Sequence, residues 1–85
     1  MANYRVVIKN SVYKDLKKIP TKDVKKIMAK VKALSINPRP PGYEKLSKDN
    51  RFRIRYRFYR VLYSIYESVL VITVVKIVHR NKVYR

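Results

Sequence analysis

Two clusters of basic residues could give this 85-residue chain its chemistry. The first holds five arginines in ten residues, from Arg51 to Arg60, and the second is residues 79–85, His-Arg-Asn-Lys-Val-Tyr-Arg. RNA cleavage by the 2′-hydroxyl needs a proton acceptor, cations for the charge on the phosphorus oxygens, and a proton donor for the leaving oxygen. Arginine supplies bidentate charge stabilisation, and imidazole titrates near neutral pH. The two clusters therefore suit metal-free chemistry on RNA.

Each cluster also has a simpler interpretation. A short run of arginines usually forms a basic strand that only holds phosphate. A single histidine is more often a surface or packing residue than a catalyst, so His79 is a candidate acid or base and no more. Tyr84 either stacks on a nucleobase or packs on the sheet as an ordinary aromatic residue.

The charge of the chain limits its partners. Lys and Arg number 22 against five Asp and Glu, which gives a formal net charge of +17 at pH 7. Such a charge favours nucleic acid, the ribosome or an acidic protein as partner. No apolar run reaches the about 20 residues of a membrane-spanning helix, and none follows a basic start as in a signal peptide. We therefore expect a cytoplasmic protein with no membrane partner.

Sites for metals and cofactors are not expected. The five acidic residues are scattered, and the chain has one His and no Cys. These residues form neither the carboxylate pair of a two-metal nuclease nor the ligand set of a zinc site. Because Gly42 is the single glycine, there is no glycine-rich loop for a nucleotide. We expect no cofactor, no metal and no small-molecule ligand.

The first half of the chain predicts one strand and two helices. Residues 4–9 are rich in β-branched side chains, which favours a strand. Asn10 or Ser11 is expected to cap a first helix that Pro20 ends, and Thr21 to cap a second. The second helix is the most clearly periodic, with apolar residues at Val24, Ile27, Met28, Val31 and Leu34. Residues 37–42, with three prolines, form a loop.

The second half predicts three antiparallel strands. Between residues 51 and 58, arginine alternates strictly with Phe, Ile or Tyr, so one face of this strand is arginine and the other apolar. Residues 59–66 and 69–78 are the next two strands. The order β-α-α-β-β-β places residues 1–85 in the α+β class as a single domain, with two N-terminal helices covering one face of a small antiparallel sheet.

Six short motifs follow one another on these elements. They are residues 15–20 (Asp-Leu-Lys-Lys-Ile-Pro), 37–42 (Asn-Pro-Arg-Pro-Pro-Gly), 45–46 (Lys-Leu), 53–55 (Arg-Ile-Arg), 59–63 (Tyr-Arg-Val-Leu-Tyr) and 79–84 (His-Arg-Asn-Lys-Val-Tyr). In this order they resemble the RelE/ParE toxin superfamily of bacterial and archaeal toxin–antitoxin systems. The resemblance implies a RelE-like fold, in which two N-terminal helices pack on a small antiparallel sheet.

The resemblance also implies an activity and roles for four arginines. RelE-like toxins enter the ribosomal A site and cut mRNA there, without metal, through the 2′-hydroxyl. Arg53 and Arg55 match basic residues that flank the scissile phosphate, and Arg60 matches the arginine that stabilises the transition state. Arg80 matches the arginine near the leaving oxygen.

Two further positions complete the catalytic set, and others are expected to hold RNA. Tyr84 matches a tyrosine that orients or stacks on the substrate base, and His79 lies where the family often has His or Lys. The residues expected to contact mRNA or ribosomal RNA by charge are Lys22, Lys25, Lys26, Lys30, Lys45, Arg51, Arg57 and Lys82. The same resemblance implies a cognate, acidic, RelB-like antitoxin as partner.

Three functions stay open on sequence alone. The first is a toxin that cuts mRNA in the ribosome and so inhibits translation and growth. The second is a ParE-like toxin of the same fold that acts on DNA gyrase without RNase activity. Those relatives generally lack the full set of basic and tyrosine positions found here. A ribosomal or RNA-chaperone module would explain the charge but not its clustering.

At two positions the chain departs from the pattern of the superfamily. Relatives commonly have Gly-Asp where Arg57-Phe58 precedes Tyr59. Because a two-residue hairpin turn favours Asn, Asp or Gly, we expect a wider or bulged turn here. Val78 replaces a glycine that usually precedes the His-Arg pair, which we expect to change the aim of His79 and Arg80.

Overall fold

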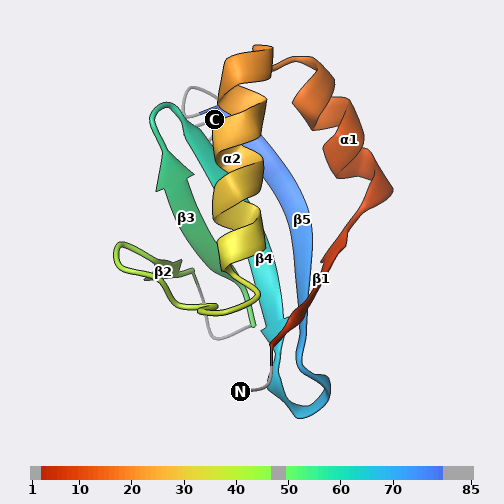
Figure 1. The fold of residues 1–85 in the computed structure, drawn as a ribbon, viewed down its shortest axis with the longest axis vertical. Helices are drawn as coiled ribbons and strands as arrows, with labels where there is room; N and C mark the ends of the chain where they lie inside the picture. Colours follow the sequence, from red (N-terminus) through yellow and green to blue (C-terminus); the bar gives the residue numbers. More distant parts are fainter. Residues whose placement is uncertain (1–2, 47–49, 80–85) are drawn as a thin grey trace.

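The two helices of the chain lie together on one face of a five-stranded sheet (Figure 1). The structure is a computed structural model that describes residues 3–46 and 50–79. The elements are β1 (Arg5–Ile8), α1 (Asn10–Lys17), α2 (Thr21–Ala33), β2 (Glu44–Lys45), β3 (Phe52–Tyr56), β4 (Tyr59–Tyr66) and β5 (Val71–His79). A 3₁₀ turn, Glu67–Val69, joins β4 to β5. Neither helix described here has the length and apolar character needed to cross a membrane.

The sheet has the strand order β1-β5-β4-β3-β2 and is mixed. Strand β1 runs parallel to β5, while the other neighbours are antiparallel. A parallel pair needs a long crossover, and here the helices and the later strands supply it. The predicted α+β class and the two helices on one face are confirmed. The sheet differs from the expected antiparallel one by the parallel β1 and by β2, whose two residues are too few to leave a sequence pattern.

The helices are held by packing and not by the expected caps. They begin at Asn10 and Thr21 themselves, after Lys9 and Pro20, and neither has a side-chain cap hydrogen bond. The predicted capping roles were therefore wrong. Instead, the apolar side of α2 faces the core as its periodicity predicts, with Ile27 and Val31 buried and Val24 and Met28 half-buried. It packs on core residues from β3, β4 and β5, and the largest fully buried side chain is Tyr63 of β4.

The turn between β3 and β4 is tight. Tyr56 pairs with Tyr59, so Arg57 and Phe58 form a two-residue hairpin, and the wider turn expected above was wrong. Arg57 adopts φ +54°, a left-handed conformation that costs about 1–2 kcal/mol for a residue with a Cβ. Strand β3 therefore ends at Tyr56, although arginine and apolar residues continue to alternate in the sequence up to Phe58.

The irregularity lies instead between β4 and β5. Leu62 pairs with Lys76 and Tyr63 with Val74, so Val75 is an extra residue on β5. A bulge of this kind reverses which face the following residues occupy. It allows both Val74 and Ile77 to be buried although they are three positions apart.

Replacing Tyr63 with phenylalanine should lower the stability of the fold by about 1 kcal/mol. Its hydroxyl donates a hydrogen bond of 2.7 Å to the Pro38 carbonyl oxygen and so ties the proline loop to β4. Burial raises the pKa of Tyr63 to about 12. This stabilisation should therefore be complete below pH 10 and be lost as the pH rises towards 12. Urea unfolding of the wild type and of Tyr63→Phe across this pH range measures the difference in their free energy of unfolding. The control is Tyr13→Phe, a change at an exposed tyrosine. An equal loss of stability in Tyr13→Phe at neutral pH would contradict the assignment.

Candidate nucleic-acid interface

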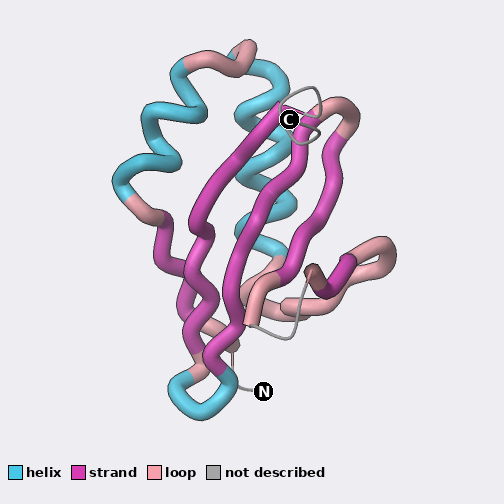
Figure 2. The backbone as a smooth tube through the Cα atoms, turned by 180° about the vertical axis from the view of Figure 1, so that it is seen from behind, coloured by secondary structure: helices cyan, strands magenta, loops and turns pink. Residues whose placement is uncertain are grey.

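One face of the sheet carries no helix of the part of the chain that the structure describes (Figure 2). The strand pairing gathers basic side chains on this face. Residues directly opposite each other on neighbouring strands share a face, and Arg55 lies opposite Arg60 and Arg53 opposite Leu62. The core residues between them, such as Val61, point the other way, towards the helices. We call this surface the open face; its members on β2 to β5 are Glu44, Arg53, Arg55, Arg60, Leu62, Ser64, Tyr66, Val71, Thr73, Lys76 and Val78. It brings together three of the predicted catalytic arginines.

Arg60 is the unusual member of the open face. Its side chain is only 6% exposed, yet Nε and Nη1 have no hydrogen-bond partner among the described residues. A buried charge that lacks partners is costly, so such groups are rarely kept for stability alone. The guanidinium group presents planar N–H pairs that match two oxygens of a phosphate. Arg60 therefore has the properties of a preformed site for a phosphate group.

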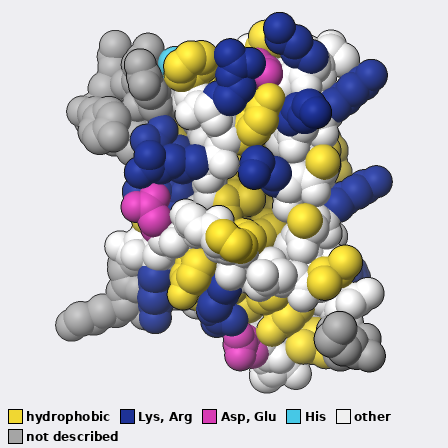
Figure 3. Space-filling view, turned by 60° about the vertical axis from the view of Figure 1, so that its left-hand side comes forward, with side chains coloured by type: hydrophobic (Ala, Val, Ile, Leu, Met, Phe, Trp, Pro, Cys, Tyr) yellow, Lys and Arg dark blue, Asp and Glu magenta, His cyan; other side chains and the backbone are white. Residues whose placement is uncertain are grey.

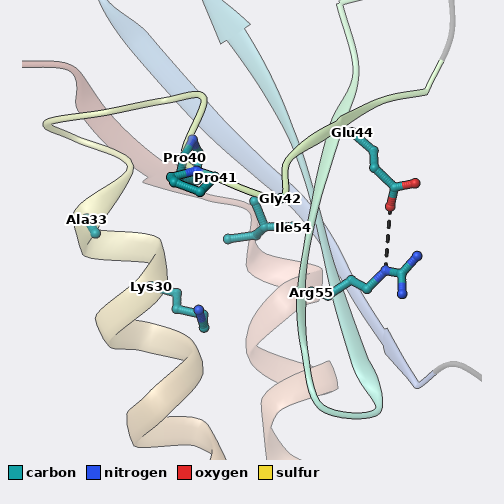
Figure 4. A pocket seen from close by; sticks show the side chains of 8 residues that line it. All are labelled: Lys30, Ala33, Pro40, Pro41, Gly42, Glu44, Ile54 and Arg55. Atoms are coloured by element: carbon teal, nitrogen blue, oxygen red, sulfur yellow. Dashed lines mark ion pairs between the residues drawn. The ribbon is translucent and has the colours of Figure 1, made fainter.

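Arg53 and Arg55 share a carboxylate. Glu44 Oε1 accepts hydrogen bonds from Arg53 Nη2 at 2.9 Å and Nε at 3.1 Å, and lies 3.6 Å from Arg55 Nε (Figure 4). Hydrogen bonding by Arg53 holds the pKa of Glu44 below its usual value. Sequence reasoning missed Glu44, because the two-residue strand that brings it beside Arg53 leaves no sequence pattern. Glu44 orients both arginines and competes with any phosphate for them.

Replacing Glu44 with glutamine should strengthen the binding of single-stranded RNA about two- to fivefold, because an exposed ion pair contributes only modestly. Fluorescence anisotropy with 2′-O-methyl RNA, which cannot be cleaved through its 2′ position, measures this. The matched control is Glu67→Gln, which removes the same charge from a 2.7 Å pair with Arg39 on the far side of the proline loop. Equal gains in both variants would show a general charge effect and not competition at Arg53 and Arg55.

His79 lies on the opposite face of the sheet from the arginines. It pairs with Tyr59, whose ring packs against the core, and the two rings meet edge to face at 5.4 Å. Val78, the preceding residue, is the one that pairs with Arg60. The imidazole and the arginines therefore approach each other only around the end of the sheet, and an acid–base role for His79 stays a prediction.

The residues expected to hold RNA divide between several surfaces. Lys22, Lys25, Lys26 and Lys30 are all exposed on α2, and Figure 3 shows basic side chains around an apolar strip on this side of the molecule. Lys45 is exposed on the edge strand β2. The predicted residues Arg80, Lys82 and Tyr84 lie outside the described residues.

Two other predicted RNA contacts flank the arginines that are predicted to be catalytic. Arg51 Nε donates to Ser64 Oγ at 3.2 Å, which places Arg51 on the open face. Arg57 lies at the tip of the β3–β4 hairpin, 3.7 Å from the Asp23 carboxylate of α2. Lys76, which sequence reasoning did not select, joins the open face because of the Val75 bulge. Its presence inside an apolar run was the signal that could have identified it.

A pocket of 410 Å³ lies where α2 meets the edge of the sheet (Figure 4). Its walls include Lys30 and Ala33 of α2, residues 40–42, and Ile54. Glu44 and Arg55 line it as well. The pocket thus connects Lys30, a predicted RNA contact, with the edge of the open face.

Comparison with known proteins identifies the family. The model of the ParE toxin of type II toxin–antitoxin systems matches residues 6–84, almost the whole chain. The chain belongs to this family. It is therefore a type II toxin of the RelE/ParE superfamily, as the motifs predicted. No curated protein matches it by sequence.

Solved structures of RelE toxins share the fold of this ParE-family toxin. RelE in the archaeal RelE–RelB complex of Pyrococcus horikoshii is 28% identical, with a TM-score of 0.85 over 94% of this chain and 98% of that chain. The toxin–antitoxin complex RelBE2 of Mycobacterium tuberculosis gives 23% identity and 0.80 over 93% and 100%. The isolated RelE toxin of Escherichia coli gives 19% and 0.78 over 95% and 90%. The first two of these toxins were solved in complex with an antitoxin.

Proposed function

We propose that this toxin is a ribosome-dependent, metal-independent mRNA endonuclease. It cuts mRNA in the ribosomal A site through the 2′-hydroxyl and so inhibits translation and growth. The observation that carries the proposal is Arg60, a buried guanidinium with two unpartnered nitrogen atoms among the described residues, on the same face as Arg53 and Arg55. This arrangement is favourable for binding a phosphodiester, whereas a buried guanidinium does not stabilise the sheet.

The arginines would act on the charge that develops during cleavage. When the 2′-oxygen attacks phosphorus, negative charge gathers on the non-bridging oxygens, and donors already in place stabilise it without reorganisation. Arg60 is assigned to these oxygens because burial strengthens its interaction with them. Arg53 and Arg55 are assigned to the flanking phosphates, on release from Glu44. Arg80 at the leaving oxygen and Tyr84 on the base follow from the resemblance alone.

The proton transfers need a group that titrates near neutral pH, since arginine is a poor base. His79 is the chain's one imidazole and follows Val78, the partner of Arg60 on β5. We assign it as the candidate acid or base, reached by the substrate around the end of the sheet.

The charge of the toxin also defines its partners in this proposal. A net charge of +17 favours binding to ribosomal RNA through groups such as the α2 lysines. It equally favours an acidic, RelB-like antitoxin that covers the basic surface. The RelE–RelB complexes among its structural relatives support such a partner.

A second candidate is a gyrase toxin without RNase activity. The observation in its favour is that the matching family model is named for the ParE toxin. A supercoiling assay with purified gyrase separates the two. Inhibition of supercoiling by a protein that leaves mRNA intact would replace the nuclease proposal.

The ends of the RNA products test the cleavage chemistry. Attack by the 2′-hydroxyl leaves a 2′,3′-cyclic phosphate and a 5′-hydroxyl. Translating ribosomes incubated with the toxin should yield these ends. Products with a 5′-phosphate and a 3′-hydroxyl, as hydrolysis by a metal-activated water gives, would contradict the proposed mechanism.

A further inference from the structure

The tip of the β3–β4 hairpin has two features that disfavour folding. Phe58, a large apolar residue, is 43% exposed there. Arg57 holds a left-handed φ of +54°, where Asn or Gly is the usual residue. Both features oppose stability, and departures from local preference of this kind concentrate at functional sites. The tip is therefore a candidate for a functional site.

The tip is part of an aromatic and cationic cluster. The rings of Phe58 and His79 are stacked, with centroids 6.0 Å apart and planes at 26°, and Tyr59 closes the far side of His79 edge to face. The Arg57 guanidinium carbon lies 5.5 Å from the centre of the Phe58 ring. His79, with Tyr59 against it, thus stacks on the Phe58 ring, and Arg57 lies over the same ring, so these groups border the exposed part of Phe58.

Basic groups lie near the exposed part of the Phe58 ring, together with two acidic ones. The tip follows the Arg55–Arg60 pair by two residues along each strand, or about 7 Å. Beside His79 lies a pocket of 270 Å³ whose walls include Lys18, Lys76 and Asp15, and Arg57 lies 3.7 Å from the Asp23 carboxylate. A strand of RNA held on the open face would reach the aromatic cluster around the end of the sheet, past Arg57.

We propose that the exposed Phe58 ring, backed by His79 and flanked by Arg57, is a stacking site for an unpaired nucleobase of RNA. The inference rests on the proposed function, because the RNA is held by the open face, and it adds a base-binding subsite to that face. Every base has a π-face that stacks on an aromatic ring, and arginine adds its planar guanidinium or a phosphate contact. The incoming base displaces the Arg57 guanidinium from the Phe58 ring, and this guanidinium then binds the phosphate next to the stacked nucleotide.

The base can come from the mRNA codon or from ribosomal RNA, and both offer the same chemistry. An acidic antitoxin segment is the competing occupant. The flat ring surface favours a base, since carboxylates would bind Arg57 alone and leave Phe58 exposed. An antitoxin contact is therefore an outcome of the test and not the proposal.

The test measures stacking directly, without cleavage. Single-stranded 2′-O-methyl RNA that carries one 2-aminopurine is titrated with the full-length protein, and the 2-aminopurine fluorescence falls when this base stacks. Phe58→Ala should weaken binding about 5- to 150-fold and abolish the fall in fluorescence, whereas Phe58→Tyr should keep both. Leu70→Ala, a change at a similarly exposed apolar residue at the other end of the sheet, is the matched control.

The outcomes separate this inference from the proposed function. Equal RNA binding by Phe58→Ala and the wild type, with unchanged thermal unfolding, would overturn the stacking site. So would a Phe58→Ala protein that loses only antitoxin binding. If the wild type bound and quenched this RNA but never cleaved mRNA, the stacking site would stand while the nuclease proposal failed. On programmed ribosomes, an altered codon profile in Phe58→Ala identifies the mRNA as the source of the base, and an altered chemical footprint on ribosomal RNA identifies the ribosome.

Discussion

Replacing Arg60 with methionine should remove cleavage and at the same time make the toxin more stable. Loss of a preorganised donor to the developing charge typically lowers the rate about 10²- to 10³-fold. Methionine has a similar length and no charge, so it fills the buried space without the two nitrogen atoms of Arg60 that lack hydrogen-bond partners among the described residues. Exchange of a buried ion for an apolar side chain is often stabilising, by about 1–4 kcal/mol. Single-turnover cleavage and urea unfolding of the same protein measure the two effects.

The opposite directions of these effects make the prediction specific. A residue kept only for the fold would lose both activity and stability on replacement. Arg55→Met is the control, because Arg55 lies opposite Arg60 but is exposed and paired with Glu44. It should lower the rate with little change in stability. If Arg60→Met destabilised the toxin as strongly as a core deletion, Arg60 would be a structural residue.

Binding of single-stranded RNA should fall about 100-fold between 50 and 200 mM KCl. The estimate assumes about five phosphate contacts on the open face, with a log–log slope of about −0.7 for each contact on a single strand. Anisotropy with 2′-O-methyl RNA across this range gives the slope.

A matched pair of variants locates these contacts. Arg53→Gln should make the slope shallower by about 0.7, because it removes one phosphate contact. Arg39→Gln removes the same charge outside the open face, where Arg39 pairs with Glu67 and lies over Phe52, and should leave the slope unchanged. Equal changes in both variants would mean that the RNA does not prefer the open face.

The periodicity of the sequence predicted the helices and the arginine face because burial imposes those patterns. Ile27 and Val31 of α2, and Leu34 directly after it, are buried as their spacing requires. The parallel pairing of β1 with β5 could not be predicted, since short strands give no sign of their neighbour. The β2 strand is set by its pairing with β3 and not by its own residues.

The position of His79 shows why the site was harder to predict than the fold. In a regular β5, the alternation would put His79 on the face of Arg60. The bulge at Val75 reverses it, so that His79 follows Ile77 to the helix side. Lys76 was one indication of the bulge, because a regular strand would have buried this charged residue among the core residues. The tight Arg57-Phe58 turn could not be predicted either. Its residue types disfavour a two-residue turn, and it is stabilised by contacts with Asp23 and His79, which are distant in the sequence.

The central claim is that the open face cleaves mRNA on the ribosome. The most direct measurement is primer extension on a defined mRNA incubated with purified toxin, with and without programmed ribosomes. Two variants accompany the wild type: Arg60→Ala, and Arg5→Ala at the far end of the sheet, which removes an equal charge from an exposed position. The account predicts cuts in the A-site codon that require ribosomes, persist in Arg5→Ala and vanish in Arg60→Ala. Intact mRNA under every condition, from wild-type protein that still arrests growth, would contradict it.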